Sequence, residues 1–214
     1  MTRAADDRLR RWLLRWSRTV TLRQTLLAIA AVAVLASGLF GGLATATPEG
    51  PAELEVGRTI HAEPFDLSIE RARQVDDLGL GGEPRGRSIA VVAKLTNTSD
   101  HPVYGSQIGR TLQLRGLDGV YRGASGDETG PSEQATPQVL VLADASILGT
   151  AAPGLEYEVA FVWEQAESEP VPTRATVAVA AHTWRKSRLD DQFLWFDPVV
   201  THSGDLAVEP GRES

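Results

Sequence analysis

The 214-residue sequence contains no cysteine. This absence excludes disulfide bonds, thiolate metal sites, a cysteine nucleophile and the lipid-modified cysteine of lipoproteins. Any exported domain must therefore be held together by its apolar core. Lysine is also scarce, because only Lys94 and Lys186 occur among the 21 basic residues, and the net charge is −7. Binding to nucleic acid needs clustered basic residues, so we expect no nucleic-acid partner.

Recognisable catalytic and metal-binding motifs are missing as well. The histidines form no H-x-x-x-H or HExxH pair, and no G-x-S-x-G nucleophile elbow occurs. The glycine-rich segment at residues 79–82 is followed by Pro84 rather than by a helix, so it does not suit phosphate binding. We therefore expect no enzyme activity, no cofactor and no metal site. The four histidines are His61, His101, His182 and His202.

Charge is absent from residues 24–48, which read QTLLAIAAVAVLASGLFGGLATATP. A hydrocarbon core of about 30 Å is crossed by about 20 helical residues, so residues 24–46 are predicted to form one transmembrane helix. The sequence Ala44-Thr45-Ala46 also suits cleavage of a signal peptide. However, the 23-residue leader and the long apolar run exceed the usual dimensions of a signal peptide. An uncleaved anchor is therefore the preferred interpretation.

The leader at residues 1–23 is basic. Its seven Arg and two Asp give a net charge of +5, which leaves −12 for the rest of the chain. Positively charged flanks stay in the cytoplasm, so the C-terminal part is expected outside the cell membrane. Leu9, Trp12, Leu13 and Trp16 share one face of a helix that carries Arg on the other face, a pattern typical of contact with membrane lipid.

Beyond a linker at residues 47–53, the chain has no helical stripe of useful length and is patterned for strands instead. Apolar and polar residues alternate most regularly from Leu155 to Trp163. Residues 54–210 are therefore predicted to form an all-β sandwich, followed by a disordered tail at residues 211–214. The other predicted strands include Phe65–Ile69, Ile89–Leu95, Val139–Leu142, Ala175–Val179 and Phe193–Phe196.

Two further details of the strand order are predicted from local patterns. Leu112 and Leu114 precede the turn Asp118-Gly119, after which Val120 and Tyr121 are expected to return as a hairpin. In addition, residues 206–208 are expected to close the last edge of the sheet.

The entry to the clearest strand reads Pro153-Gly154-Leu155-Glu156-Tyr157. It resembles the tyrosine corner of fibronectin type III and other Ig-like domains, which implies a Greek-key sandwich whose Tyr157 bonds back to the backbone. The whole layout resembles the membrane-anchored, Ig-like extracytoplasmic proteins of actinobacteria. They combine a basic leader, one transmembrane helix and a sandwich with a central strand ending in Asn-Thr-Ser, here residues 97–99. This resemblance implies an accessory or interaction role.

The segment from Trp184 to Pro198 reads WRKSRLDDQFLWFDP and combines aromatic with basic residues. On a strand, Phe193 and Trp195 point to one face and Phe196 to the other, so both faces require burial. One face is expected to lie in the core. The other face is expected to be covered either by a loop or by a partner, and a partner is considered because interfaces are enriched in aromatic residues. The candidate partner surface comprises Trp184, Arg185, Phe193, Trp195 and Phe196.

Together these features predict a non-enzymatic accessory or interaction protein of the cell envelope, anchored in the cell membrane by a single pass with its N-terminus inside. An integral membrane protein, such as a transporter, is the expected partner. The alternative is an extracytoplasmic ligand-binding or sensing module in which the 184–198 aromatics form a pocket mouth. The oligomeric state has no signature in the sequence.

Overall fold

The computed structural model describes residues 26–27, 50–75, 86–121, 128–129 and 135–211. The whole predicted leader, most of the predicted transmembrane helix, residues 47–49 of the predicted linker, the 79–82 segment and residues 212–214 therefore lie outside the described residues. Leu26 and Leu27 are helical. In the part of the chain that is described, no helix is both long and apolar enough to cross a bilayer. The chain divides into the units Met1–Glu49 and Gly50–Ser214, and the fold below is that of the second unit.

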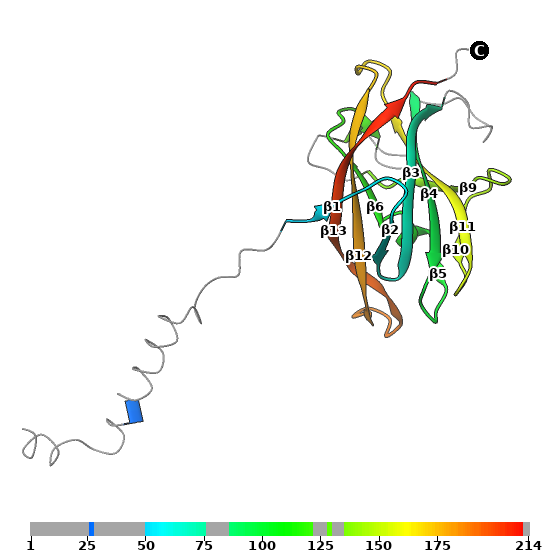
Figure 1. Cartoon of the computed structure of the whole chain (residues 1–214). Coiled ribbons are helices and arrows are strands. Elements are labelled where there is room, and N and C mark those ends of the chain that lie inside the picture. Colours follow the sequence, from blue (N-terminus) through cyan, green and yellow to red (C-terminus); the bar gives the residue numbers. More distant parts are fainter. Residues whose placement is uncertain (1–25, 28–49, 76–85, 122–127, 130–134, 212–214) are drawn as a thin grey trace, which may run out of the picture. The chain divides into compact units, whose positions relative to one another are not determined.

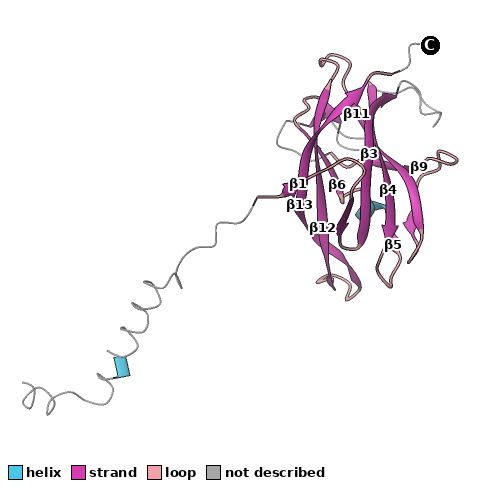
Figure 2. Cartoon of the chain, viewed as in Figure 1, coloured by secondary structure: helices cyan, strands magenta, loops and turns pink. Residues whose placement is uncertain are grey.

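The second unit is an all-β domain, with one short helix among its described elements (Figures 1 and 2). The long strands are β3 (Phe65–Val75), β4 (Arg87–Asn97), β11 (Glu156–Gln165), β12 (Arg174–Lys186) and β13 (Phe193–Glu209). The four-residue strands are β2 (Thr59–Ala62), β6 (Leu112–Arg115) and β9 (Gln138–Val141). The shortest elements are β1 (Ala52–Glu53), β5 (Val103–Tyr104), β7 (Val120–Tyr121), β8 (Glu128–Thr129), β10 (Thr150–Ala151) and the helix α3 (Gly105–Ile108).

The strands form the two layers of a β-sandwich (Figure 1). One layer has the order β6-β12-β13, with β1 paired in parallel to β13. The other layer contains β2, β3, β4 and β11, with β7 and β9 paired to β11. The end of β13 also pairs in parallel with β3, at Val208 opposite Ala72, so hydrogen bonding passes from one layer to the other. Strands β5 and β10 form a separate two-stranded sheet.

The main core lies between the layers and comes from the alternating positions of the long strands. Strand β11 pairs with β4 along its whole length, and Val159, Phe161 and Trp163 of β11 are buried in this core. The predicted strand is therefore confirmed, with Val159, Phe161 and Trp163 on its core side, whereas Leu155 is 53% exposed. Full burial of a side chain such as Phe161 stabilises the fold by about 2–3 kcal/mol. The largest fully buried side chains include Phe65, Leu67, Ile69, Ile89 and Leu95.

The opposite face of β4 and β11 is buried too. Ala90, Leu140, Ala160 and Val162 form a second, smaller cluster, and each is at most 5% exposed. The sequence pattern assigned Ala160 to the solvent side of its strand. Strand β9 pairs with this part of β11, with Leu140 opposite Ala160. Alternation therefore predicts the strand correctly, but it does not predict whether the second face of the strand is exposed.

Two predicted details of the strand order are wrong. Strand β6 pairs with β12, whereas β7 pairs with β8 and β11, so the Asp118-Gly119 turn connects the two layers instead of closing a hairpin. Residues 206–208 do not close an edge either, because they belong to β13, which lies between β12 and β3. In addition, Ala52 and Glu53, expected in the linker, form β1.

Candidate functional site: the distal hairpin

Strands β12 and β13 form a long hairpin whose outer part contains the predicted aromatic segment. We call residues 184–197 the distal hairpin. Lys186 lies opposite Phe193, and the backbone N–H of Ser187 donates to the carbonyl of Gln192 at 2.6 Å to close the turn. The Lys186 ammonium lies 2.7 Å from a carboxylate oxygen of Asp191. The turn is therefore ordered by its own residues.

One side of the distal hairpin is an aromatic cluster centred on Trp184. The indole of Trp184 stacks on the ring of His101, with centroids 4.5 Å apart and planes 13° apart. Trp195, directly opposite on β13, lies at 5.2 Å, and Phe193 at 6.0 Å. Trp195 is buried in the main core, and its carbonyl accepts a hydrogen bond from the Gln107 amide at 3.0 Å. Phe193, in contrast, is 53% exposed.

Arg185, Phe196 and Asp197 form a second group in the distal hairpin. The Arg185 guanidinium lies 4.3 Å from the centroid of the Phe196 ring and donates two hydrogen bonds to the Asp197 carboxylate. Hydrogen bonding to Arg185 lowers the pKa of Asp197, and the same bonds raise the pKa of Arg185. Because both side chains are exposed, this ion pair adds little to the stability of the fold, and its main effect is to hold the Arg185 side chain in one orientation.

The five residues predicted as a partner surface therefore fall into two groups: Trp184, Phe193 and Trp195 share the aromatic cluster, and Arg185 contacts Phe196. Sequence reasoning missed two contributors. His101 comes from the loop after β4, and no local pattern links it to Trp184. Asp197 was available from the sequence as the acidic residue next to Phe196, but its pairing with Arg185 depends on the register of the hairpin.

The predicted corner residues lie at the start of β11. The Tyr157 hydroxyl accepts a hydrogen bond from the Ala152 amide at 3.0 Å. Gly154 has a φ of 70°, in the region that favours glycine, and its N–H donates to the carbonyl of Asn97 at 2.7 Å. Pro153 precedes this glycine in the turn. The corner thereby joins β11 to the end of β4.

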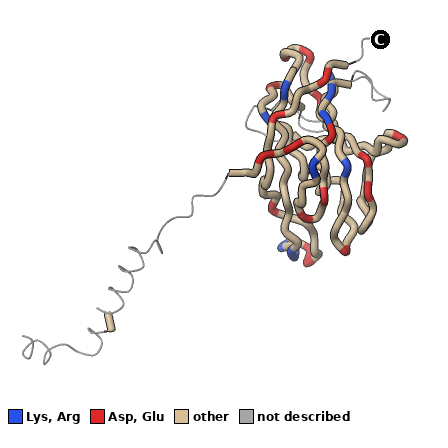
Figure 3. Tube along the Cα trace, in the orientation of Figure 1, with Lys and Arg blue, Asp and Glu red and all other residues tan. Residues whose placement is uncertain are grey.

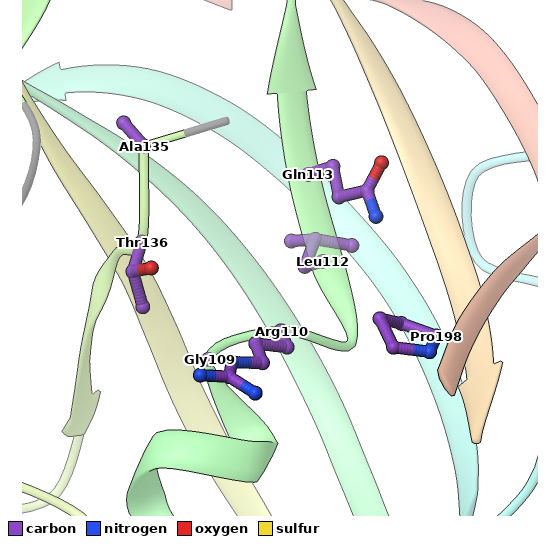
Figure 4. Close-up of a pocket in the computed structure, with 7 residues that line it drawn as sticks. All are labelled: Gly109, Arg110, Leu112, Gln113, Ala135, Thr136 and Pro198. Atoms are coloured by element: carbon purple, nitrogen blue, oxygen red, sulfur yellow. The ribbon is translucent and has the colours of Figure 1, made fainter. Parts of the chain in front are cut away.

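A cavity of about 280 Å³ lies in a different part of the domain (Figure 4). Of the aromatic segment 184–198, only Pro198 lines it. The aromatic side chains thus do not form the mouth of this cavity. The lining residues are Gly109, Arg110, Leu112, Gln113, Ala135, Thr136 and Pro198.

Titratable side chains do not converge into a metal centre anywhere in the described ranges, where no three His, Asp or Glu residues gather. The one histidine with a shifted pKa is His182, which is 5% exposed. Burial lowers its pKa, and the positive charge of Arg110 acts in the same direction, while a backbone carbonyl of Glu63 opposes them. Neither ring nitrogen of His182 has a hydrogen-bond partner.

Comparison with known proteins adds one structural similarity. No protein-family model matches the chain, and no curated protein matches it. The chain is similar to the crystal structure of an uncharacterized β-sandwich protein from Clostridium difficile 630, with a TM-score of 0.39 and 10% identity. The similarity covers 75% of this chain and 97% of that one. The fold described above rests on the strand pairing of this chain alone.

Proposed function

We propose that the chain is a non-enzymatic accessory protein of the cell envelope, and that its distal hairpin binds a protein partner embedded in the same membrane. In this proposal the sandwich is an Ig-like Greek-key domain outside the cell membrane, tethered by the transmembrane helix predicted at residues 24–46. The observation that carries it is a surface in which Phe193 stays exposed beside the half-buried Trp184, which packs on the buried Trp195.

The composition of this surface suits protein recognition. Tyr, Trp and Arg dominate the energetics of protein interfaces, and aromatic residues gain most when they are held rigidly before binding. Trp184 lies against both Trp195 and His101, so the side chains beside Phe193 are already packed. Arg185 is held by Asp197 and Phe196. Little conformational entropy would then be lost when a partner binds.

The charge pattern favours a protein partner over a lipid surface. Basic and acidic residues lie together at the end of the hairpin (Figure 3). Lys186 is paired with Asp191, and Arg185 is paired with Asp197. Attraction to anionic lipid needs an excess of Lys and Arg, which these pairs cancel. Mixed charges around an aromatic centre are typical of the polar rim of a protein interface.

Backbone strain at the same place supports a functional role. Asp191 and Asp197 both have positive φ, at 59° and 53°, within the distal hairpin. A positive φ raises the conformational free energy of residues other than glycine, although Asp tolerates it better than most. Such residues concentrate at functional sites. The strain lies beside the surface assigned to the partner.

Cross-linking and co-purification of the full-length protein from its native membranes tests this role. Phe193→Ser removes the exposed aromatic ring, and Val171→Ser is the matched control, since Val171 is 57% exposed in the connection that precedes β12. The buried Trp195 is unsuitable because its loss would also disturb the core. We expect one membrane protein to co-purify with the wild type and with Val171→Ser, but not with Phe193→Ser. Equal recovery with all three, or recovery of no specific protein, would refute the proposal.

The alternative role, a ligand-binding or sensing module, has one specific observation in its favour. The cavity beside α3 is open to solvent and is lined by segments that are distant in sequence, with both polar and apolar walls. None of the aromatic side chains of the distal hairpin lines this cavity.

A further inference from the structure

The cavity walls come from four parts of the chain that the fold brings together (Figure 4). Gly109 and Arg110 follow α3, and Leu112 and Gln113 belong to β6. Ala135 and Thr136 precede β9, while Pro198 lies in β13. A volume of about 280 Å³ is close to the lower end of the range of small-molecule sites. The space therefore suits a small ligand.

These walls are held in place by hydrogen bonds outside the cavity. The Trp163 indole N–H donates to the carbonyl of Ala135 at 3.0 Å. The backbone N–H of Arg110 donates to the carbonyl of Gln107 at 3.1 Å. Gln113 is paired in register with Ala178 of β12. The cavity is thus built from fixed backbone, as is usual for ligand sites.

Gly109 sets the distance between two of the walls. A Cβ atom at this position would lie 3.2 Å from Thr136 Cγ2 and 3.3 Å from the carbonyl oxygen of Pro137. Both distances are shorter than an ordinary van der Waals contact. Glycine at this position lets the segment before β9 approach the turn after α3, which brings the Thr136 and Arg110 walls together.

One charged side chain belongs to the described lining. Arg110 is the only ionisable residue among the seven described residues that line the cavity. In the described ranges its guanidinium has no ion pair and no hydrogen-bond partner. Arg110 is exposed, and no carboxylate of the described residues pairs with it, so its guanidinium is accessible to an anion.

We infer that this cavity binds a small aliphatic carboxylate. The planar guanidinium of Arg110 matches a carboxylate with two parallel hydrogen bonds, and its single charge balances a single negative charge. A phosphate dianion would need a second cation, which the described lining residues do not supply. The Thr136 hydroxyl adds a polar group, and the apolar side chains of Leu112, Ala135 and Pro198 suit a short hydrocarbon chain.

Thermal unfolding of the full-length protein in detergent, with butyrate as the probe, tests the inference. Binding to the native state raises the unfolding midpoint with ligand concentration. Arg110→Gln removes the charge, and Arg174→Gln is the matched control, an exposed Arg at the start of β12. We expect butyrate to raise the midpoint of the wild type and of Arg174→Gln, and Arg110→Gln to need at least tenfold more butyrate for the same shift.

Two further probes test the chemical class. Butyramide has the same size without the charge, and inorganic phosphate has charge without the hydrocarbon chain. We expect neither to match butyrate. The inference is overturned if butyrate leaves the wild type unchanged, if Arg110→Gln responds as the wild type does, or if either comparison probe acts as strongly. These results do not bear on the distal hairpin, because the partner experiment uses different residues.

Discussion

The hydroxyl of Tyr157 lies 3.0 Å from the backbone nitrogen of Ala152, on the other side of the turn that leads into β11. Removing this hydroxyl leaves the Ala152 N–H without its partner in a partly buried place. We expect Tyr157→Phe to lower the free energy of unfolding by about 1 kcal/mol. Urea denaturation measures the change, and Tyr104→Phe serves as control because Tyr104 is 52% exposed. Equal stability of Tyr157→Phe and the wild type would contradict a structural role for this bond.

Asn97 is the most heavily bonded polar side chain at the same corner. Its amide group donates to the carbonyls of His101 and Ala151, and its oxygen accepts from the N–H and hydroxyl of Ser99. Asn97 and Ala151 are both 0% exposed, so Asn97→Ala leaves a buried carbonyl unpaired. We expect a loss of about 2–4 kcal/mol in urea denaturation, against about 1 kcal/mol for Ser99→Ala. Similar losses of stability in Asn97→Ala and Ser99→Ala would show that Asn97 contributes no more to the stability of this corner than Ser99 does.

Gly204 provides the space in which β1 packs on β13. A Cβ atom there would lie 2.9 Å from the carbonyl oxygen of Leu54 and 3.0 Å from its Cβ. Gly204→Ala should therefore displace the chain around Leu54 and cost about 1–3 kcal/mol, as overpacked sites do. Gly149→Ala is the control, because nothing lies within 4 Å of a Cβ at that position. Hydrogen exchange should show faster exchange of the Leu54 amide in Gly204→Ala only. Unchanged protection of that amide would refute the expectation.

We expect His182 to make the stability of the domain sensitive to acid. Burial holds its pKa in the folded state below the usual value of about 6.5, so the unfolded chain binds the proton more readily. Its contribution to stability is complete above about pH 6.5 and is lost as the pH falls below that value toward the folded-state pKa.

The His182→Leu variant isolates this effect. Since neither ring nitrogen has a partner, an apolar replacement leaves no group newly unpaired, and stability at pH 7.5 should change by less than about 1 kcal/mol. Denaturation at pH 7.5 and pH 5.5 should show a smaller loss in the variant than in the wild type. Identical losses would exclude His182 as the source of acid sensitivity.

Most of the strands predicted from the sequence show alternation, while Val139–Leu142 and Phe193–Phe196 are predicted from short apolar or aromatic runs. Leu155–Trp163 was recognised from the residues alone, because a strand with one face in a core repeats every two residues. β13 was divided into two pieces, since its middle part, from Asp197 to Asp205, contains proline and polar residues. Register shifts in its pairing with β12 occur in this part, and they remove the regular period.

The pairing of strands was harder to predict than their existence. The Asp118-Gly119 sequence is a strong turn signal, yet this turn joins the two layers. Whether a turn closes a hairpin depends on the partner with which each flanking strand pairs, and here β6 pairs with β12 while β7 pairs with β11. The candidate site shows the same limit. Aromatic and basic residues at 184–196 were visible as a group, but the contact between His101 and Trp184 arises only when the fold brings the loop after β4 to the hairpin.

One continuous strand connects three parts of this domain. β13 begins in the distal hairpin, holds β1 at His202 and Ser203, and ends against β3 of the other layer. A mechanical load on the chain ahead of Ala52 enters the domain through the β1 pairing and acts on β13 along its length. Because β13 pairs with β12 in one layer and with β3 in the other, such a load would be shared by both layers.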